Sequence, residues 1–431
     1  MIAHDMWNKR PHGPNGLKLK ELQRVKVENV RLYVSVEREF RNGFGDVHMF
    51  FGSLNPNPES IRSSRVNIKI NSIYRRRINK NVSLTFTEYS SQPLKSSKMA
   101  KRMLFRAMLS VKIKPENSAF INTQRSYLHT KENIPTKEIE IPLQFGHIAA
   151  KVWGNDQDRP ILALHGWQDN AGTWDTLAPL LCENRSIMAI DFPGHGLSSW
   201  IPPGLHYYAW ELPRLILYLK NYFKWDKVSL LCHSMGSIAG LRYASVFQDD
   251  VDFYVAVDSL IYDDFDLHQI VEKFPVILNK IEVAQTRLHE EPPSYTLEEI
   301  AMKWHLGTAK SVSLESTKYL MRRGIKPASR DPNKYYFCRD ARLKHSLFQP
   351  ENKKFVEALV KRLKCPTLYV KAIDSPFASD EFSVEMREVI ERNNENYEIH
   401  FLPGTHHVHL NNPERVAPLI FKFLQKYNFK I

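Results

Sequence analysis

The alternation of apolar and polar residues becomes regular only from about Lys137 onward. Residues 138–142 and 147–153 alternate with a period of two, which predicts a hairpin of two half-buried strands. Short continuous apolar runs then follow, and such runs are typical of strands that are buried on both faces. They lie at 160–164, 186–190, 228–232, 251–257, 367–370 and 397–401. Helical apolar spacing is found at 210–225, 236–246 and 414–427.

This order of elements predicts an α/β fold. Strands that alternate with helices form a mostly parallel sheet, because right-handed crossovers carry the helices over its faces. Between 260 and 349 the pattern is mainly helical and charged, and this insertion falls between two predicted buried strands. We therefore expect one α/β domain at 137–428, with helices on both faces of a central sheet and with residues 260–349 as a helical cap.

The first 136 residues have a different composition. They contain 25 Lys and Arg against 10 Asp and Glu, a net charge of +15, whereas the rest of the chain has 35 against 37. Residues 1–98 show no sustained periodicity, which predicts that 1–136 is a basic and poorly ordered extension. Because the positive charge is confined to this extension and no nucleic-acid-binding motif accompanies it, we expect no nucleic-acid partner.

Residues 99–130 combine basic and apolar residues with a single acidic residue, Glu116. This composition is typical of a mitochondrial transit peptide, and an ordinary basic linker is the alternative. No apolar stretch approaches the ~18 residues of a membrane span, and the N-terminus lacks the apolar core of a secretory signal. The four cysteines form no CxxC pair, which argues against a zinc site of that type and for a reducing compartment. We expect an intracellular protein, cytoplasmic or mitochondrial and not secreted, with no transmembrane segment.

The clearest chemical motif is the segment LLCHSMGS at 230–237. A predicted buried strand runs directly into a predicted helix, and Ser234 lies at the junction. This turn resembles the nucleophile elbow Gly-x-Ser-x-Gly of α/β-hydrolases, in which the residues two before and two after the serine are small. Gly236 fits this requirement, whereas Cys232 replaces the first glycine. A serine in this position points to nucleophilic catalysis.

A histidine-rich loop, PGTHHVH at 403–409, follows the last predicted strand. A serine nucleophile needs an imidazole base within hydrogen-bonding reach, and the α/β-hydrolase fold supplies it from this loop. His406 is the expected base because of its spacing to the segment NPE at 412–414. His407 is the alternative base, and His409 is expected to pack locally.

Together these motifs resemble the serine hydrolase-like family of α/β-hydrolases, which includes the insect kraken-type serine hydrolases. The shared segments are HGWQDNA at 165–171, DFPGHG at 191–196, HSMG at 233–236, FCRDARL at 337–343 and HHVH at 406–409. The resemblance covers 137–428, and it implies an α/β-hydrolase fold, a Ser nucleophile, and no metal or cofactor. It also implies an oxyanion hole formed by the backbone amides of Trp167 and Met235. We interpret His165 and His195 as residues that order their loops.

The acid of the catalytic triad has two candidates. In α/β-hydrolases this acid follows either of two strands of the sheet. Asp258 lies 24 residues after Ser234, at the end of the earlier strand, and Asp374 follows the later strand one residue earlier than the usual pattern. We favour Asp258 as the acid that orients the imidazole, and Asp374 is the alternative.

The sequence therefore favours a serine hydrolase that cleaves carboxylic esters or related acyl compounds of small size through an acyl-enzyme on Ser234. The alternative is a catalytically degenerate α/β-hydrolase that binds a ligand or a partner, because Cys232 departs from the elbow pattern and the acid is ambiguous. A haloalkane dehalogenase is disfavoured, since that branch carries Asp at the elbow. Several large apolar residues of the cap either line an apolar pocket or form the cap's own core. They are Phe274, Trp304, Tyr319, Leu320 and Met321.

Overall fold

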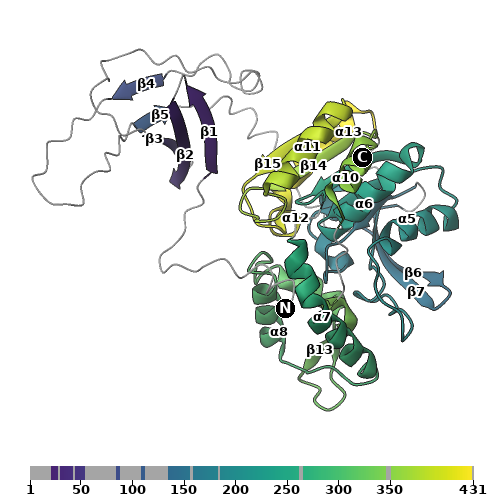
Figure 1. The fold of residues 1–431 in the computed structure, drawn as a ribbon. Helices are drawn as coiled ribbons and strands as arrows, with labels where there is room; N and C mark the ends of the chain where they lie inside the picture. The colour runs from purple at the N-terminus through teal and green to yellow at the C-terminus, as the bar shows by residue number, and fades with distance from the viewer. Residues whose placement is uncertain are drawn as a thin grey trace, which may run out of the picture. The chain divides into compact units, whose positions relative to one another are not determined.

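The computed structural model describes residues 134–155, 159–182, 185–261, 266–345 and 351–429, together with five strands nearer the N-terminus. The chain divides into two compact units (Figure 1). One unit comprises Pro11–Phe120, and the other comprises Met1–Arg10 with Ile121–Ile431.

In the first unit the structure describes the backbone of two antiparallel sheets. Their strands are β1 (Glu21–Val27), β2 (Val30–Arg41) and β3 (Phe44–Ser53) in one sheet, and β4 (Leu84–Thr87) and β5 (Met108–Val111) in the other. Apart from β5, the predicted transit peptide at 99–130 lies outside the described residues. The predicted poor order of the remaining extension lies outside them as well.

The second unit is built on an eight-stranded sheet with the order β15-β14-β11-β10-β8-β9-β7-β6. The strands from β15 to β9 are parallel, whereas β7 is antiparallel to both β9 and β6. The predicted hairpin and the predicted mostly parallel sheet are therefore confirmed. The bounds are β6 (Thr136–Leu143), β7 (Gly146–Trp153), β8 (Ile161–Leu164), β9 (Ile187–Ile190), β10 (Val228–His233), β11 (Val251–Val257), β14 (Thr367–Ala372) and β15 (Tyr397–Leu402).

Helices cover both faces of this sheet, as the alternating pattern predicts. On one face lie α5 (Glu211–Tyr222), α6 (Met235–Val246), α10 (Lys353–Lys361) and α11 (Glu381–Asn393). On the other face lie the short helices η1 (Ala171–Trp174), α4 (Ala178–Leu181) and α12 (Val408–Asn411), and the long helix α13 (Pro413–Lys426). The short helix η2 (Gln248–Asp250) precedes β11.

Alternate side chains of the central strand β10 enter two separate hydrophobic cores. Leu230 and Cys232 pack with Leu241 of α6 on one face, and Leu231 packs with Ile420 of α13 on the other. The side chains of a strand alternate between its faces, so a strand that is apolar at every position is buried on both sides. This explains why the central strands appear in the sequence as continuous apolar runs.

The cap lies between β11 and α10 and is grouped at one end of the unit (Figure 1). It comprises α7 (Leu267–Thr286), α8 (Leu297–Gly307), α9 (Thr317–Gly324), β12 (Ile325–Pro327), β13 (Tyr335–Phe337) and η3 (Ala341–His345). Trp304 and Leu320 lie in a small core of the cap itself, and Tyr319 and Met321 pack against this core. Phe274 is half-buried on α7. Most of the apolar cap residues named above thus form the cap's own core.

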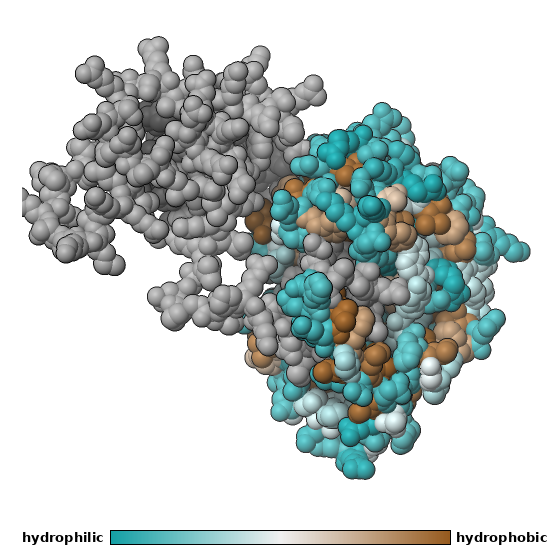
Figure 2. Space-filling view, viewed as in Figure 1, coloured by the Kyte–Doolittle hydropathy of each residue, from teal (hydrophilic) through white to brown (hydrophobic). Residues whose placement is uncertain are grey.

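The outer surface of the cap carries apolar side chains as well. Val271, Val276, Leu278 and Val283 of α7 are exposed, and Figure 2 shows apolar patches among hydrophilic residues in the region that α7 occupies in Figure 1. Among the described residues, no helix has both the length and the apolar character needed to cross a membrane.

Candidate active site

Ser234 lies at the sharp turn between β10 and α6. Its backbone has φ 52° and ψ −119°, and its N–H donates a hydrogen bond to Val257 O at 3.1 Å. A non-glycine residue rarely adopts a positive φ, and such strained residues gather at functional sites. The turn leaves Ser234 half-buried at the carboxyl edge of the sheet, between two buried elements.

The elbow is tight because strand and helix approach each other closely. A Cβ atom on Gly236 would lie 2.5 Å from Leu164 O, so this position requires glycine. The bulkier Cys232 is accommodated from the opposite side, because Gly240 of α6 has no Cβ. A Cβ atom on Gly240 would lie only 3.0 Å from the Cys232 sulfur. The departure from the elbow pattern at Cys232 is therefore matched by a glycine one helical turn farther along α6.

Ser234, His406 and Asp258 are brought together in one hydrogen-bonded chain. The Ser234 hydroxyl lies 2.8 Å from His406 Nε2, and His406 Nδ1 lies 2.7 Å from Asp258 Oδ2. Since a carboxylate only accepts hydrogen bonds, Nδ1 carries the proton and Nε2 is free to accept the hydroxyl proton. Three segments that are far apart in the sequence thus meet at the carboxyl ends of β10, β11 and β15.

Asp258 is fully buried and is held from the neighbouring strand β14. Its second oxygen, Oδ1, accepts hydrogen bonds from Lys371 Nζ at 2.9 Å and from Ala372 N at 2.8 Å. Lys371 also donates to the carbonyl oxygens of Ala372 and Ser375, at 2.6 and 3.2 Å. The sequence reasoning missed Lys371, although a lysine at the end of an otherwise apolar strand was a visible signal.

His406 is buried against two aromatic rings, those of Phe377 at 4.2 Å and His233 at 4.6 Å between centroids. Burial lowers the pKa of His406 below its usual 6.5, and the hydrogen bond with Asp258 offsets part of this effect. The imidazole is therefore neutral at pH 7, the form that accepts a proton from a serine hydroxyl. Phe377 was also missed, because nothing in its local sequence indicates that it would cover the imidazole.

The alternative acid, Asp374, and the alternative base, His407, form hydrogen bonds with residues other than Ser234, His406 and Asp258. Asp374 Oδ2 accepts a hydrogen bond from Gly404 N at 3.0 Å and so joins the two loops that follow β14 and β15. His407 Nε2 lies 3.1 Å from Asp169 Oδ2, and its Nδ1 contacts the hydroxyl of Ser311. Each alternative thus ties a loop of the site to its neighbour.

The loop after β8 lies directly beside the nucleophile. A Cβ atom on Gly166 would lie 2.9 Å from His233 Nδ1 and 3.2 Å from Ser234 Cβ, so only glycine lets the loop approach this closely. Trp167 follows in the chain, and its indole Nε1 donates to Leu343 O of the cap at 3.1 Å. Met235 begins α6, so its N–H has no acceptor within the helix. The backbone around Trp167 and Met235 therefore flanks Ser234.

His165 and His195 hold the backbone of this region. His165 Nε2 accepts from Phe192 N at 3.0 Å, and His195 Nε2 accepts from Gln168 N at 3.2 Å. Burial is the main cause that lowers the pKa of His165 to about 4 and that of His195 to about 3. Both rings are therefore neutral acceptors at pH 7, in agreement with the interpretation that they order their loops.

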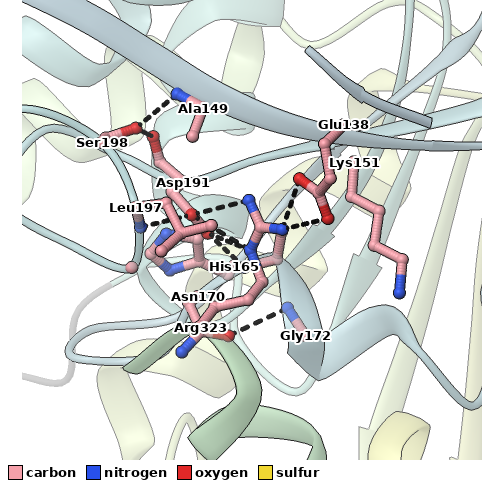
Figure 3. A network of polar contacts seen from close by, with 12 residues as sticks. Glu138, Ala149, Lys151, His165, Asn170, Gly172, Asp191, Leu197, Ser198 and Arg323 are labelled. Carbon is pink, nitrogen blue, oxygen red and sulfur yellow. Dashed lines mark hydrogen bonds and ion pairs between the residues drawn. The ribbon is translucent and has the colours of Figure 1, made fainter. Parts of the chain in front are cut away.

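Behind the loop, an ionic network centred on the buried Arg323 and Asp191 joins the cap to the sheet (Figure 3). Arg323 of α9 donates to Asp191 Oδ2 through Nη2 at 2.9 Å and to Glu138 of β6 through Nη1 at 2.6 Å. Asp191 also accepts from Ala171 N at 2.7 Å and from Leu197 N at 2.8 Å. One carboxylate thus fixes the loop after β8 (residues 165–171, the predicted oxyanion loop), the turn after β9 and the cap to one another.

His409 packs locally, as expected, with its Nε2 2.9 Å from Thr173 Oγ1. Within the described residues, one group of side chains has the spacing of a metal site. Asp169, His233 and His407 each offer a ligand atom, and these atoms lie within 4.8 Å of one another. Asp169 and His407 already form the hydrogen bond described above, which orders the loops on either side of the elbow.

The comparisons with known proteins agree with this architecture. Residues 161–419 match the model of the alpha/beta hydrolase family. A "Probable serine hydrolase" of Drosophila melanogaster is 33% identical over 292 residues, which cover 67% of this chain and 88% of that protein. The human "Serine hydrolase-like protein 2" is 30% identical over 301 residues, with coverages of 67% and 94%.

A solved structure of a hypothetical protein from Pseudomonas aeruginosa is similar with a TM-score of 0.58 and 30% sequence identity. The match covers 67% of this chain and 99% of that one. The predicted family resemblance is therefore confirmed: the chain belongs to the alpha/beta hydrolase family, in its serine hydrolase-like branch.

Proposed function

We propose that this protein is a serine hydrolase that cleaves carboxylic esters or related acyl compounds through an acyl-enzyme on Ser234. The observation that carries the proposal is the hydrogen-bonded chain from Ser234 through His406 to Asp258, with separations of 2.8 and 2.7 Å. Membership of the alpha/beta hydrolase family supports hydrolysis as the reaction class.

In the first half of the reaction, Ser234 Oγ attacks the acyl carbonyl carbon while its proton passes to His406 Nε2. The negative charge that develops on the carbonyl oxygen is stabilised by the N–H groups of Trp167 and Met235. Asp258 stabilises the imidazolium and keeps it oriented. When the bond to the leaving group breaks, His406 returns the proton to the departing oxygen, and an acyl-enzyme remains.

In the second half, water takes the place of the leaving group. His406 removes a proton from water, the resulting oxygen nucleophile attacks the acyl carbon, and the acid departs as the proton returns to Ser234 Oγ. The neutral imidazole that this step needs is favoured by burial, which lowers the pKa of His406.

The alternative, a degenerate hydrolase that only binds a ligand, rested on Cys232 and on the ambiguous acid. Cys232 is accommodated by Gly240, and Asp258 has the geometry of a triad acid. These two observations favour the enzyme over the binding protein.

A fluorophosphonate probe tests the proposal, because it reacts only with an activated serine. We expect the wild-type protein to be labelled and Ser234→Ala to be unlabelled. Ser237→Ala is a matched control, since Ser237 is a buried serine of α6 whose hydroxyl has no hydrogen-bond partner. Turnover of 4-nitrophenyl esters of graded chain length then measures the acyl preference. Equal labelling of Ser234→Ala, or a wild type that neither labels nor turns over any ester, contradicts the proposal.

A further inference from the structure

The cap segment around Arg339 is fixed directly over the loops of the candidate active site. Asp340 N donates to Gly194 O at 2.8 Å, and Trp167 Nε1 donates to Leu343 O at 3.1 Å. The Cys338 thiol donates to Gly196 O at 3.2 Å. Three contacts over six residues therefore hold this segment against both the oxyanion loop and the turn after β9.

Arg339 brings a positive charge into this region, and no acidic side chain of the described residues pairs with it. Its guanidinium carbon lies 4.4 Å from the centre of the Phe337 ring and 5.8 Å from that of Trp304. Among the ion pairs of the described residues, none includes Arg339. Its Nε atom is buried and has no hydrogen-bond partner. Cation–π contacts compensate only part of the cost of removing a guanidinium from water.

Two carboxylates of this region, those of Asp340 and Asp169, are already engaged. Asp340 accepts from Arg342 Nη2 at 2.6 Å and from the Tyr207 hydroxyl at 2.8 Å. Asp169 is held by His407 at 3.1 Å. Burial lowers the pKa of Arg339 to about 10, and the attraction of Asp169 offsets this only in part. Arg339 is therefore charged at pH 7 and half-buried, and it has no ion-pair partner among the residues that the structure describes.

A second donor without an acceptor lies on the oxyanion loop. Gln168 follows Trp167, its backbone has φ 61°, and its side-chain Nε2 is buried without a hydrogen-bond partner. Its backbone N–H is held by His195, and the charge of Arg339 is one of the smaller causes that lower the pKa of that histidine. The cap and the predicted oxyanion loop thus each contribute a buried donor atom, Arg339 Nε and Gln168 Nε2, that lacks an acceptor among the described residues. Such groups are costly unless an acceptor satisfies them on binding.

We propose that Arg339, assisted by Gln168, binds an anionic oxygen group of the substrate, a carboxylate or a phosphate, so that the enzyme prefers acyl compounds that carry a negative charge. This inference rests on the proposed function and names its substrate class. An arginine fork matches the geometry of both groups, and its unpaired state leaves all of its donors for the ligand.

The test compares two esters with the same leaving group and the same chain. One is 4-nitrophenyl hydrogen adipate, whose free carboxylate is ionised at pH 7, and the other is its neutral methyl ester. The measured quantity is the ratio of their kcat/KM values. We expect Arg339→Gln to lower this ratio tenfold to a hundredfold, as is typical for the loss of a hydrogen-bonded charge. Arg339→Lys keeps the charge without the fork and should give an intermediate ratio.

Arg330→Gln is the matched control, because Arg330 is an exposed arginine in the turn between β12 and β13; its ratio should equal that of the wild type. If Arg339 only supports the cap, Arg339→Gln will lower kcat/KM for both esters equally, and the unchanged ratio overturns the proposal. Inhibition by free adipate or by inorganic phosphate identifies the anion, and inhibition by neither contradicts an anion site.

A binding measurement separates this inference from the proposed function. Calorimetric titration of Ser234→Ala with methyl hydrogen adipate needs no turnover. We expect Arg339→Gln in that background to weaken binding at least tenfold, whereas dimethyl adipate should bind equally to both proteins. If the wild type hydrolyses neutral esters without a preference for the charged one, the substrate class is wrong while the hydrolase stands. If charged ligands bind but no ester is cleaved, the hydrolase is wrong while the anion site stands.

Discussion

Replacing Asp258 with asparagine is the sharpest test of the triad, because the structure determines which way the new amide must face. Oδ1 of Asp258 accepts from two donors, Lys371 Nζ at 2.9 Å and Ala372 N at 2.8 Å. The carbonyl oxygen of the new amide must take that position, so its NH₂ group turns toward His406 Nδ1. Two donors cannot share one hydrogen bond, and His406 must shift its proton to Nε2. The imidazole then has no lone pair for the Ser234 hydroxyl.

We expect Asp258→Asn to lower kcat by about 10⁴, which corresponds to about 5.5 kcal/mol of lost transition-state stabilisation. Asp374→Asn is the matched acid-to-amide control. The carbonyl oxygen of the amide introduced there can still accept from Gly404 N, a contact of 3.0 Å, so kcat should fall less than tenfold. Steady-state hydrolysis of a 4-nitrophenyl ester measures both values, and circular dichroism verifies that both variants fold. A large loss in Asp374→Asn with a small loss in Asp258→Asn would refute the assignment.

The geometry of the site and its surroundings leads to three further predictions. Burial lowers the pKa of His406 below 6.5, and the base must be neutral to accept a proton. The value of kcat/KM should therefore fall only as the pH drops below about 6.5, and a fall in kcat/KM with its midpoint above pH 7 contradicts this. Arg323→Met leaves the buried Asp191 without its cation. In a denaturation experiment it should lower the free energy of unfolding by about 3–5 kcal/mol. The adjacent Arg322→Met removes an exposed arginine from Asp175, which keeps its contact with Lys151 at 2.7 Å, and should lower the free energy of unfolding by less than about 1 kcal/mol; equal losses would refute a special role of the network. Gly240→Ala places a Cβ 2.8 Å from a buried tyrosine ring and should destabilise the fold by about 1–3 kcal/mol, whereas an unchanged melting temperature argues against the tight elbow.

The strands of the sheet could be predicted from the sequence, because the central strands are buried on both faces and appear as continuous apolar runs. The run at 251–257 coincides with β11, and the run at 228–232 differs from β10 by one residue. The elbow was also visible, since a serine between a buried strand and a helix is a local pattern. Ser234, His406 and Asp258 then meet because the carboxyl ends of parallel strands lie at the same edge of a sheet.

The choice between the two acids depended on geometry that the sequence does not contain. Strands β11 and β14 are neighbours, with Val257 paired to Val370, so both following loops reach the same edge of the sheet. Asp258 has φ 52°, a backbone conformation that no local pattern indicated. On β14 the corresponding region supplies Lys371, a cation that pairs with Asp258. The sequence was equally unable to decide which of the adjacent histidines is the base, because His406 and His407 differ in the direction of their side chains, which no sequence pattern gives.

Three buried carboxylates hold the loops of this site, and each accepts hydrogen bonds from an element other than its own. Asp258 accepts from β14, Asp169 from His407, and Asp191 from the predicted oxyanion loop and from Arg323. Burying a carboxylate is costly, and well-packed apolar side chains would stabilise the fold at least as well. Apolar contacts, however, do not fix the direction of a backbone amide, whereas a charged acceptor does. An oxyanion hole and a proton relay require groups that are already oriented before the reaction begins. The ionic network behind the site is therefore best explained by the orientation it imposes on the loops of the candidate site rather than by the stability it adds.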